Sequence, residues 1–129
     1  MLSSFDPLVA EWFATRFGGA TEPQLLGWPR ILDGRDVLIS APTGSGKTLA
    51  AFLVCIDSLV RRARLSPLPD QTEVVYVSPL KALSNDIHKN LEVPLKEISA
   101  LAASHGVPLA PIRTVIPPYP SSPRRTCAA

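Results

Sequence analysis

The stretch that decides the expected fold is the octapeptide Ala41-Pro42-Thr43-Gly44-Ser45-Gly46-Lys47-Thr48. It follows the apolar run Val37-Leu38-Ile39 and precedes Leu49-Ala50-Ala51-Phe52-Leu53-Val54, which has the composition of a buried helix. A strand, a Gly-rich loop and a helix that opens with Gly-Lys-Thr are together typical of a phosphate-binding loop. Ala41 stands where the common pattern has its first glycine, so the pattern here is Ala-x4-Gly-Lys-Thr.

Each residue type in this loop suits the binding of a nucleotide phosphate. Gly44 and Gly46 allow backbone conformations that a Cβ would obstruct, so that successive N–H groups turn inward as an anion nest. The N-terminus of the following helix adds unpaired N–H donors. Lys47 is predicted to reach the β- and γ-phosphates of ATP, and the Thr48 hydroxyl to coordinate Mg²⁺. The alternative is a Gly/Ser turn with a surface lysine, but the strand, the spacing and the helix all argue against it.

Composition places the chain among single-domain globular proteins. Its 129 residues, 46% of them apolar, are enough for one domain with a core, and the net charge of +2 is too small to indicate nucleic-acid binding by itself. The two cysteines have no metal-ligand spacing, and Cys55 lies in an apolar helix, which fits a reduced residue in a cytoplasmic protein. Neither a membrane-spanning run nor a signal peptide is recognisable, so no membrane partner is expected.

The pattern along the chain predicts alternating helices and strands. Asp6-Pro7 opens a helix to about Phe17, and Thr21 caps a second helix that should kink or break at Pro29. Further along, strands are predicted at 36–40, 74–78 and 111–116, and helices from the phosphate loop to about 64, after Lys81, and from Pro94 to about His105. This order predicts an α/β fold with a parallel sheet flanked by helices, and the phosphate loop at the carboxyl edge of the sheet.

Two parts of the chain differ in composition. Residues 1–116 carry all the expected elements and are predicted to form the folded domain. Residues 117–129 contain four prolines and two adjacent arginines without helical or strand period, and are predicted to be a disordered tail. Such a tail either has no folded role or serves as an interaction segment.

Beyond the phosphate loop, several segments carry a resemblance to a known family. They are Thr21-Glu22-Pro23-Gln24, Gly27-Trp28-Pro29, Gly34-Arg35-Asp36, and Tyr76-Val77-Ser78-Pro79-Leu80-Lys81-Ala82-Leu83. With the loop, they resemble the first RecA-like domain of superfamily 2 (DEAD/DEAH-box type) ATP-dependent helicases, most closely the Lhr-type helicases. The resemblance implies a partial RecA-like P-loop NTPase domain, with ATP and Mg²⁺ as cofactors and single-stranded DNA or RNA as partner. It carries no prediction of the oligomeric state.

The resemblance assigns roles to residues outside the loop. In these helicases a glutamine upstream of the phosphate loop reads adenine, which implies this role for Gln24; the alternative is a helix capping box with Thr21, and the two are compatible. Trp12 and Phe17 either stack on the base or pack in the core.

The segment after the second predicted strand matches the family's nucleic-acid contact. The resemblance implies that Pro79, Leu80 and Lys81 touch the sugar-phosphate backbone of a single strand, with Lys81 as the phosphate partner. The alternative for Lys81 is an ordinary solvated surface lysine.

Part of the hydrolytic machinery of the resembled enzymes has no counterpart in the sequence. ATP hydrolysis needs a carboxylate for Mg²⁺ and a group that orients water, but the chain contains no Asp-Glu pair and its last acidic residue is Glu97. The resemblance ends near Thr114, and for this reason the chain is expected to be a truncated or frame-shifted gene product. Two readings stay open: the ATP-binding part of a helicase, or a non-catalytic nucleotide-binding module, with turnover near background for this chain alone. Gln24 and the segment 78–83 argue against a third, a small-molecule kinase.

Overall fold

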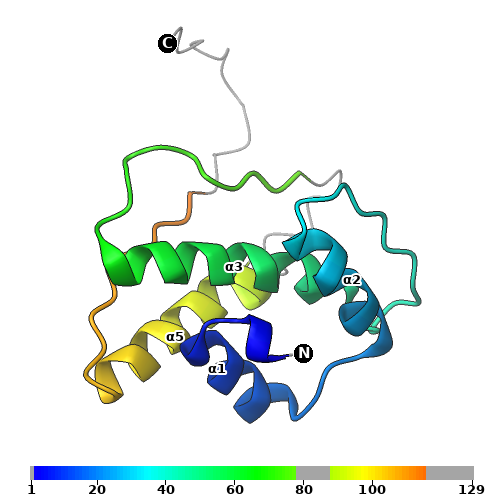
Figure 1. Ribbon diagram of the computed structural model, residues 1–129, viewed down its shortest axis with the longest axis horizontal. Helices are drawn as coiled ribbons and strands as arrows, with labels where there is room; N and C mark the ends of the chain where they lie inside the picture. The colour runs from blue at the N-terminus through cyan, green and yellow to red at the C-terminus, as the bar shows by residue number, and fades with distance from the viewer. Residues whose placement is uncertain (1, 78–87, 116–129) are drawn as a thin grey trace, which may run out of the picture.

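The computed structural model describes residues 2–77 and 88–115, and their regular structure is helical (Figure 1). The elements in chain order are the 3₁₀ turn η1 (Leu2–Ser4), α1 (Pro7–Phe17), α2 (Glu22–Leu32), α3 (Lys47–Leu65), the π turn η3 (His88–Glu92) and α5 (Val93–Ser104). The long helix α3 lies in the middle of this arrangement. Its first turns pack against α2, and α1 packs against both α3 and α5.

The helix boundaries follow from the local signals in the sequence. The Asp6 carboxylate accepts a hydrogen bond from the Leu8 N–H at 3.0 Å and caps α1, with Pro7 in the first turn, as predicted. Pro94 lies in the first turn of α5, where a missing N–H costs nothing. By contrast, α2 runs through Pro29 to Leu32, so of the kink or break expected at Pro29 the break does not occur. That proline is close to the helix end, where it removes one hydrogen bond without preventing the last turn.

The core lies between the helices. The largest fully buried side chain is Trp28 of α2, whose ring packs edge-on against Phe5 and Phe13 at centroid distances of 5.0 Å and 5.5 Å. Leu53 and Ile56 of α3 and several residues of α5 complete the cluster. Because Phe5 and residues of α1, α2 and α3 all contribute to it, this cluster fixes how α2 lies against the start of α3.

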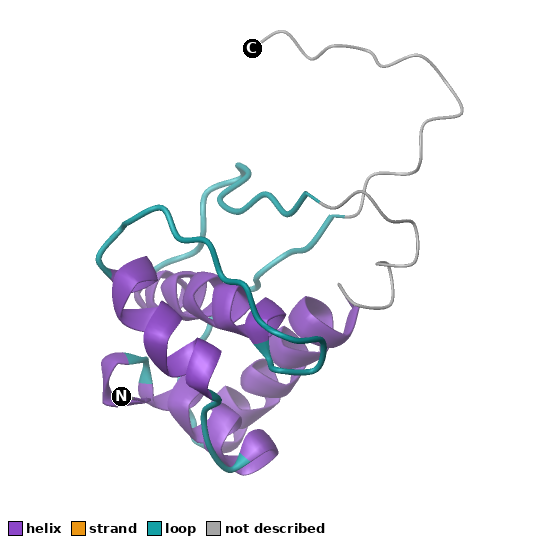
Figure 2. Ribbon diagram, turned by 90° about the vertical axis from the view of Figure 1, so that its right-hand side faces the viewer, coloured by secondary structure: helices purple, strands orange, loops and turns teal. Residues whose placement is uncertain are grey.

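The predicted α/β fold with a parallel sheet is wrong for the residues that the structure describes. The runs 36–40, 74–77 and 111–115 are loops in Figure 2, and no backbone hydrogen bond joins one of these runs to another. A strand is completed by the hydrogen-bonding groups of a neighbour, which an apolar run does not supply by itself. Leu38 is 96% exposed and Val77 is 84% exposed, whereas a strand inside a parallel sheet is buried on both faces.

These runs nevertheless lie against the helices on one side. Ile39 packs on α2, where its Cδ1 lies 3.1 Å from the point at which a Cβ on Gly27 would stand. Tyr76 packs against Phe52 of α3, with the ring centroids 5.0 Å apart and the rings tilted by 42°. In the run after α5, Ile112 packs against the core, and just before this run the Ala110 N–H donates to the Ala63 carbonyl at 2.9 Å. Each run thus has one face on the helical layer and the other in solvent.

Several predictions fall outside the described residues. Ser78 at the end of the second predicted strand, the helix expected after Lys81, and the tail 117–129 all lie there, so the division into a domain at 1–116 and a disordered tail stays a prediction. Among the helices of residues 2–77 and 88–115, none combines the length and the apolar character needed to cross a membrane.

Candidate functional site

The phosphate-loop sequence forms a turn that leads directly into α3. Gly44 and Gly46 have φ values of +82° and +79°, in the left-handed region that glycine adopts at little cost. The Ser45 N–H donates to the Pro42 carbonyl at 3.2 Å, which closes the turn. Gly46 is the N-cap of α3 and Lys47 its first residue, as the sequence predicts. The first N–H groups of a 19-residue helix therefore stand beside the loop.

Lys47 turns back across this loop. Its Nζ donates a hydrogen bond to the Ala41 carbonyl at 2.7 Å, so that the side chain joins the first residue of the octapeptide to the start of the helix. The ammonium group is thereby held among the loop residues 41–46, and Thr48 follows it in the first turn of α3, half-buried. The structure thus brings together the cation and the hydroxyl that the sequence assigns to phosphate and to Mg²⁺.

Gln24 is buried against the loop, with 3% of its surface exposed. Its Oε1 accepts from the Thr21 N–H at 3.0 Å, so the capping box predicted for these two residues is present. Its Nε2 donates to the Gly46 carbonyl at 3.1 Å, a contact that the sequence did not indicate. The Thr21 hydroxyl donates to the Ser45 carbonyl at 2.8 Å. The start of α2 therefore holds the last two residues of the loop, and adenine recognition by Gln24 stays a prediction.

The loop residues fit a bound phosphate and its metal. Ser45 Oγ is buried and has no hydrogen-bond partner among the described residues, which leaves a polar atom for a ligand to satisfy. A Cβ on Gly44 would meet nothing within 4 Å, so the backbone is open to a ligand there. Together with Lys47 and the helix N-terminus, this is a donor set suited to an anion. For Mg²⁺ the loop would supply the Thr48 hydroxyl, an oxygen ligand of the kind that this cation prefers. The described residues contain no cluster of three metal-ligating His, Cys, Asp or Glu side chains.

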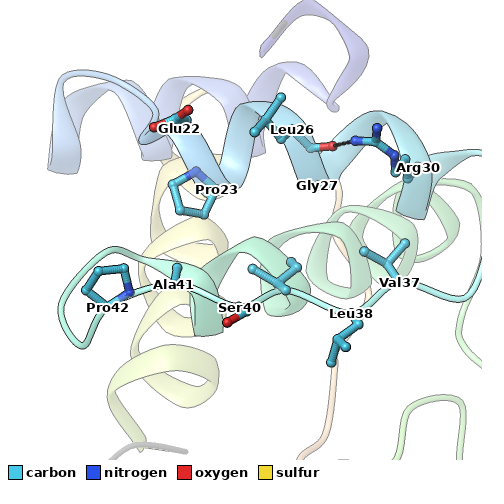
Figure 3. Close-up of a pocket in the computed structure, with 11 residues that line it drawn as sticks. Glu22, Pro23, Leu26, Gly27, Arg30, Val37, Leu38, Ser40, Ala41 and Pro42 are labelled. Atoms are coloured by element: carbon cyan, nitrogen blue, oxygen red, sulfur yellow. Dashed lines mark hydrogen bonds between the residues drawn. The ribbon is translucent and has the colours of Figure 1, made fainter.

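A groove that the sequence analysis missed lies between α2 and the extended run before the loop (Figure 3). It has a volume of about 420 Å³ and ends at Ala41 and Pro42. Figure 3 shows Leu26 and Gly27 of α2 on one wall and the run from Val37 to Pro42 on the other. Gly27, a glycine inside a helix, was the signal for this close approach of the backbone.

The two aromatic residues considered as base-stacking partners differ in position. Trp12 is 5% exposed and its Nε1 donates to Glu97 Oε2 at 2.6 Å, so the core interpretation is confirmed for Trp12. Phe17 is half-exposed and packs edge-on against Trp12 at 5.8 Å, and its stacking on a base stays a prediction. The predicted nucleic-acid residues Pro79, Leu80 and Lys81 lie outside the described residues.

The site thus consists of a Gly-rich turn with a lysine that reaches into it, and a glutamine and a threonine upstream hold the turn in place. The chain belongs to the DEAD/DEAH box helicases, whose family model matches residues 21–115.

Within that family, the chain is similar to the Lhr helicases, as the sequence indicated. It is 50% identical over 111 residues to the ATP-dependent helicase Lhr-Core protein 2 of Thermococcus barophilus, covering 86% of this chain and 13% of that protein. It is also 50% identical over 115 residues to the Lhr helicase/probable uracil glycosylase of Mycolicibacterium smegmatis, covering 88% of this chain and 7% of that protein. The chain therefore spans only a small part of the length of these relatives.

A solved structure supports the same relationship. The structure of Mycobacterium smegmatis helicase Lhr bound to ssDNA and AMP-PNP matches with a TM-score of 0.75 at 47% identity. The match covers 86% of this chain and 14% of that one. The described helices and loops thus follow the path of one segment of an Lhr helicase.

Proposed function

We propose that this chain is the ATP-binding portion of an ATP-dependent helicase that acts on single-stranded DNA or RNA. The observation that carries the proposal is the position of Lys47, whose ammonium lies within the loop 41–46 at the N-terminus of α3. The left-handed glycines support it, and so does the Ser45 hydroxyl of the same loop, which has no hydrogen-bond partner in residues 2–77 and 88–115. The family match and the solved relative, which is bound to AMP-PNP, support a nucleotide as the ligand.

In this proposal each loop residue has a defined role. Lys47 leaves the Ala41 carbonyl for the β- and γ-phosphates, a stronger charge-assisted partner. Backbone N–H groups of residues 43–46 would surround the phosphates, and the Thr48 hydroxyl would be a ligand of Mg²⁺, which when bound neutralises phosphate charge.

Gln24 retains enough hydrogen-bonding capacity to read adenine. A carboxamide has two acceptor lone pairs and two N–H donors. The structure uses one lone pair for the Thr21 N–H and one donor for the Gly46 carbonyl. One acceptor and one donor remain, which is what the N6 and N7 edge of adenine requires.

Nucleic-acid binding belongs to the proposal through the resemblance of residues 78–83. Pro79, Leu80 and Lys81 would contact the backbone of a single strand, and such contacts weaken with salt. The solved relative is bound to ssDNA, which supports a single strand as the partner.

For this chain alone we propose binding without turnover, the non-catalytic alternative. The acidic side chains of α3 and α5 are already engaged: Asp57 accepts from the Asp6 N–H and from Arg61, and both oxygens of Glu97 accept hydrogen bonds from Trp12 and Arg16. None of these carboxylates is therefore free to hold Mg²⁺ or to orient a water.

A cytoplasmic location is part of the same proposal. Cys55 is half-buried on α3, and burial raises the pKa of its thiol above the ordinary value of 9.0. A thiol held in its protonated form reacts slowly, which is consistent with the reduced core residue that the sequence predicts.

The test is the binding of a fluorescent ATP analogue to the 129-residue chain in the presence of Mg²⁺. Saturable binding is expected, and Lys47→Ala should weaken it about tenfold or more, because a charge-assisted contact to phosphate is lost. Lys96→Ala, which removes an exposed lysine of α5, is the matched control and should leave the affinity unchanged. Equal affinities of wild type and Lys47→Ala would refute the site.

A second assay separates binding from catalysis. ATP hydrolysis by the same chain, with and without single-stranded DNA or RNA, is expected to stay near background. Nucleic-acid-stimulated hydrolysis that disappears in Lys47→Ala would show that the chain is an enzyme by itself.

A further inference from the structure

Side chains of α2 and its cap donate hydrogen bonds to backbone carbonyls at the start of α3. There are three such bonds: Thr21 Oγ1 to the Ser45 carbonyl at 2.8 Å, Gln24 Nε2 to the Gly46 carbonyl at 3.1 Å, and Trp28 Nε1 to the Ala50 carbonyl at 3.1 Å. The last two donors are four residues apart, and so are their acceptors. Four residues are about one helical turn, so the two helices are joined at matching positions one turn apart.

This spacing makes the two bonds interdependent. A shift of α2 along α3 by one residue is a movement of about 1.5 Å, which takes a hydrogen bond out of its range. Trp28 is fully buried, and its ring is fixed by Phe5 and Phe13. Its N–H therefore has no alternative partner in solvent, and the indole is the less mobile of the two donors.

We propose that Trp28 is a positioning residue for the phosphate loop. Its N–H fixes the register of α2 on α3, and this register holds the Gln24 amide on the carbonyl of Gly46, the residue directly before Lys47. Trp28 acts through Gln24 and touches no nucleotide. The nucleotide readout of this inference rests on the proposed function.

The experiment compares the two tryptophans of the chain, Trp28→Phe and Trp12→Phe. Both changes delete an indole N–H donor, but the Trp12 N–H bonds to Glu97 of α5 and not to α3. Loss of one net hydrogen bond corresponds to a twofold to tenfold change in an equilibrium. Trp28→Phe is expected to weaken the binding of the ATP analogue by about that factor, and Trp12→Phe is expected to leave the affinity unchanged.

Hydrogen exchange of the nucleotide-free chain provides a second readout that does not depend on ATP. In Trp28→Phe, the amides of residues 50–54, which are hydrogen-bonded in the first full turn of α3, should exchange faster by a similar factor, while those of α5 should not change. If Trp28 only fills the core, its replacement should accelerate exchange throughout the helices, in proportion to the lost stability. The denaturation midpoint of each variant supplies that reference.

An isosteric replacement covers the case in which Trp28→Phe does not fold. In the Trp12→Phe background Trp28 is the only tryptophan, so biosynthetic replacement of tryptophan by 3-benzothienylalanine exchanges its N–H for sulfur and keeps the two-ring shape. Faster exchange confined to residues 50–54 is again expected.

The outcomes distinguish this inference from the proposed function. If the wild-type chain does not bind the analogue, the proposed function fails and the exchange data alone decide the role of Trp28. If Lys47→Ala loses binding while Trp28→Phe and the benzothienyl chain match Trp12→Phe in affinity and exchange, the positioning role is overturned and the nucleotide site stands.

Discussion

Gly46→Ala tests whether the start of α2 fixes the shape of the phosphate loop. Gly46 has φ +79°, and a Cβ there would lie 2.6 Å from Gln24 Nε2 and 3.3 Å from Thr21 Oγ1. Gln24 is 3% exposed and its amide is hydrogen-bonded at both ends, so moving it aside breaks these two bonds. The alanine therefore displaces the amide from the Gly46 carbonyl.

The expected cost has two parts. An alanine in the left-handed region costs about 1–2 kcal/mol. Losing the two hydrogen bonds of Gln24 costs about 0.5–1.5 kcal/mol each. Gly46→Ala should therefore lower the free energy of unfolding by about 2–5 kcal/mol.

Gly44→Ala is the matched control, because it isolates the backbone term. Gly44 has nearly the same φ, +82°, but its Cβ would meet nothing within 4 Å. It should lose only the conformational term of about 1–2 kcal/mol.

The assay is urea denaturation followed by tryptophan fluorescence, with the slope of the transition used to check that both variants unfold in the same way. Gly46→Ala should exceed Gly44→Ala by about 1–3 kcal/mol, and the excess should shrink when Gln24→Ala is combined with it. An excess below about 0.5 kcal/mol, or one that persists without the Gln24 amide, would refute the reasoning.

Two further predictions concern charged pairs away from the loop. Asp57 is buried and accepts from the backbone N–H of the α1 N-cap residue at 2.5 Å and from Arg61 at 2.7 Å. Asp57→Ala should therefore lower the free energy of unfolding by about 2–3 kcal/mol, whereas Asp70→Ala, which removes a 92% exposed surface carboxylate, should change it by less than about 0.5 kcal/mol. Equal losses in urea denaturation would contradict this expectation. The hydrogen bonds from Arg62 lower the pKa of Glu73 from 4.5 to about 2, so this pair stabilises the fold above pH 4.5 and its contribution is lost as the pH falls toward 2. An NMR titration should give a carboxyl midpoint near 2 that moves up in Arg62→Ala, and an unmoved midpoint would exclude Arg62 as the cause.

The helices could be predicted because their signals are local. Asp6 caps α1 through the N–H of a residue two positions away, and Thr21 and Gln24 form their capping box within one turn. The glycines of the phosphate loop are of the same kind, since the absence of a Cβ permits the positive φ found at Gly44 and Gly46. The position of Lys47 in the first turn of α3 follows from these signals.

The predicted sheet did not rest on local signals of this kind, and it is wrong for the described residues. The runs 36–40 and 74–77 have strand composition, but a strand depends on hydrogen bonds from residues distant in sequence. In the described residues, Tyr76 packs against Phe52 and Ile39 packs on α2, while the backbone of each run forms no hydrogen bond with another run. The hydrophobic pattern indicated that these runs have apolar residues that pack on other elements. It also implied that both faces of each run are covered, but only the face toward the helices is.

The contacts of the loop explain how the site keeps its shape without a strand ladder beside it. The side-chain hydrogen bonds that hold the loop come from Thr21 and Gln24, and the remaining one is internal, from Lys47 to Ala41. The extended run before the loop contributes packing through Ile39 but no such bond among the described residues. Because α2 supplies these anchors and Trp28 joins the same helix to α3 one turn further on, the geometry of the phosphate loop depends on the α2–α3 contact. A substitution at that contact should therefore reach the loop even where it lies outside the octapeptide.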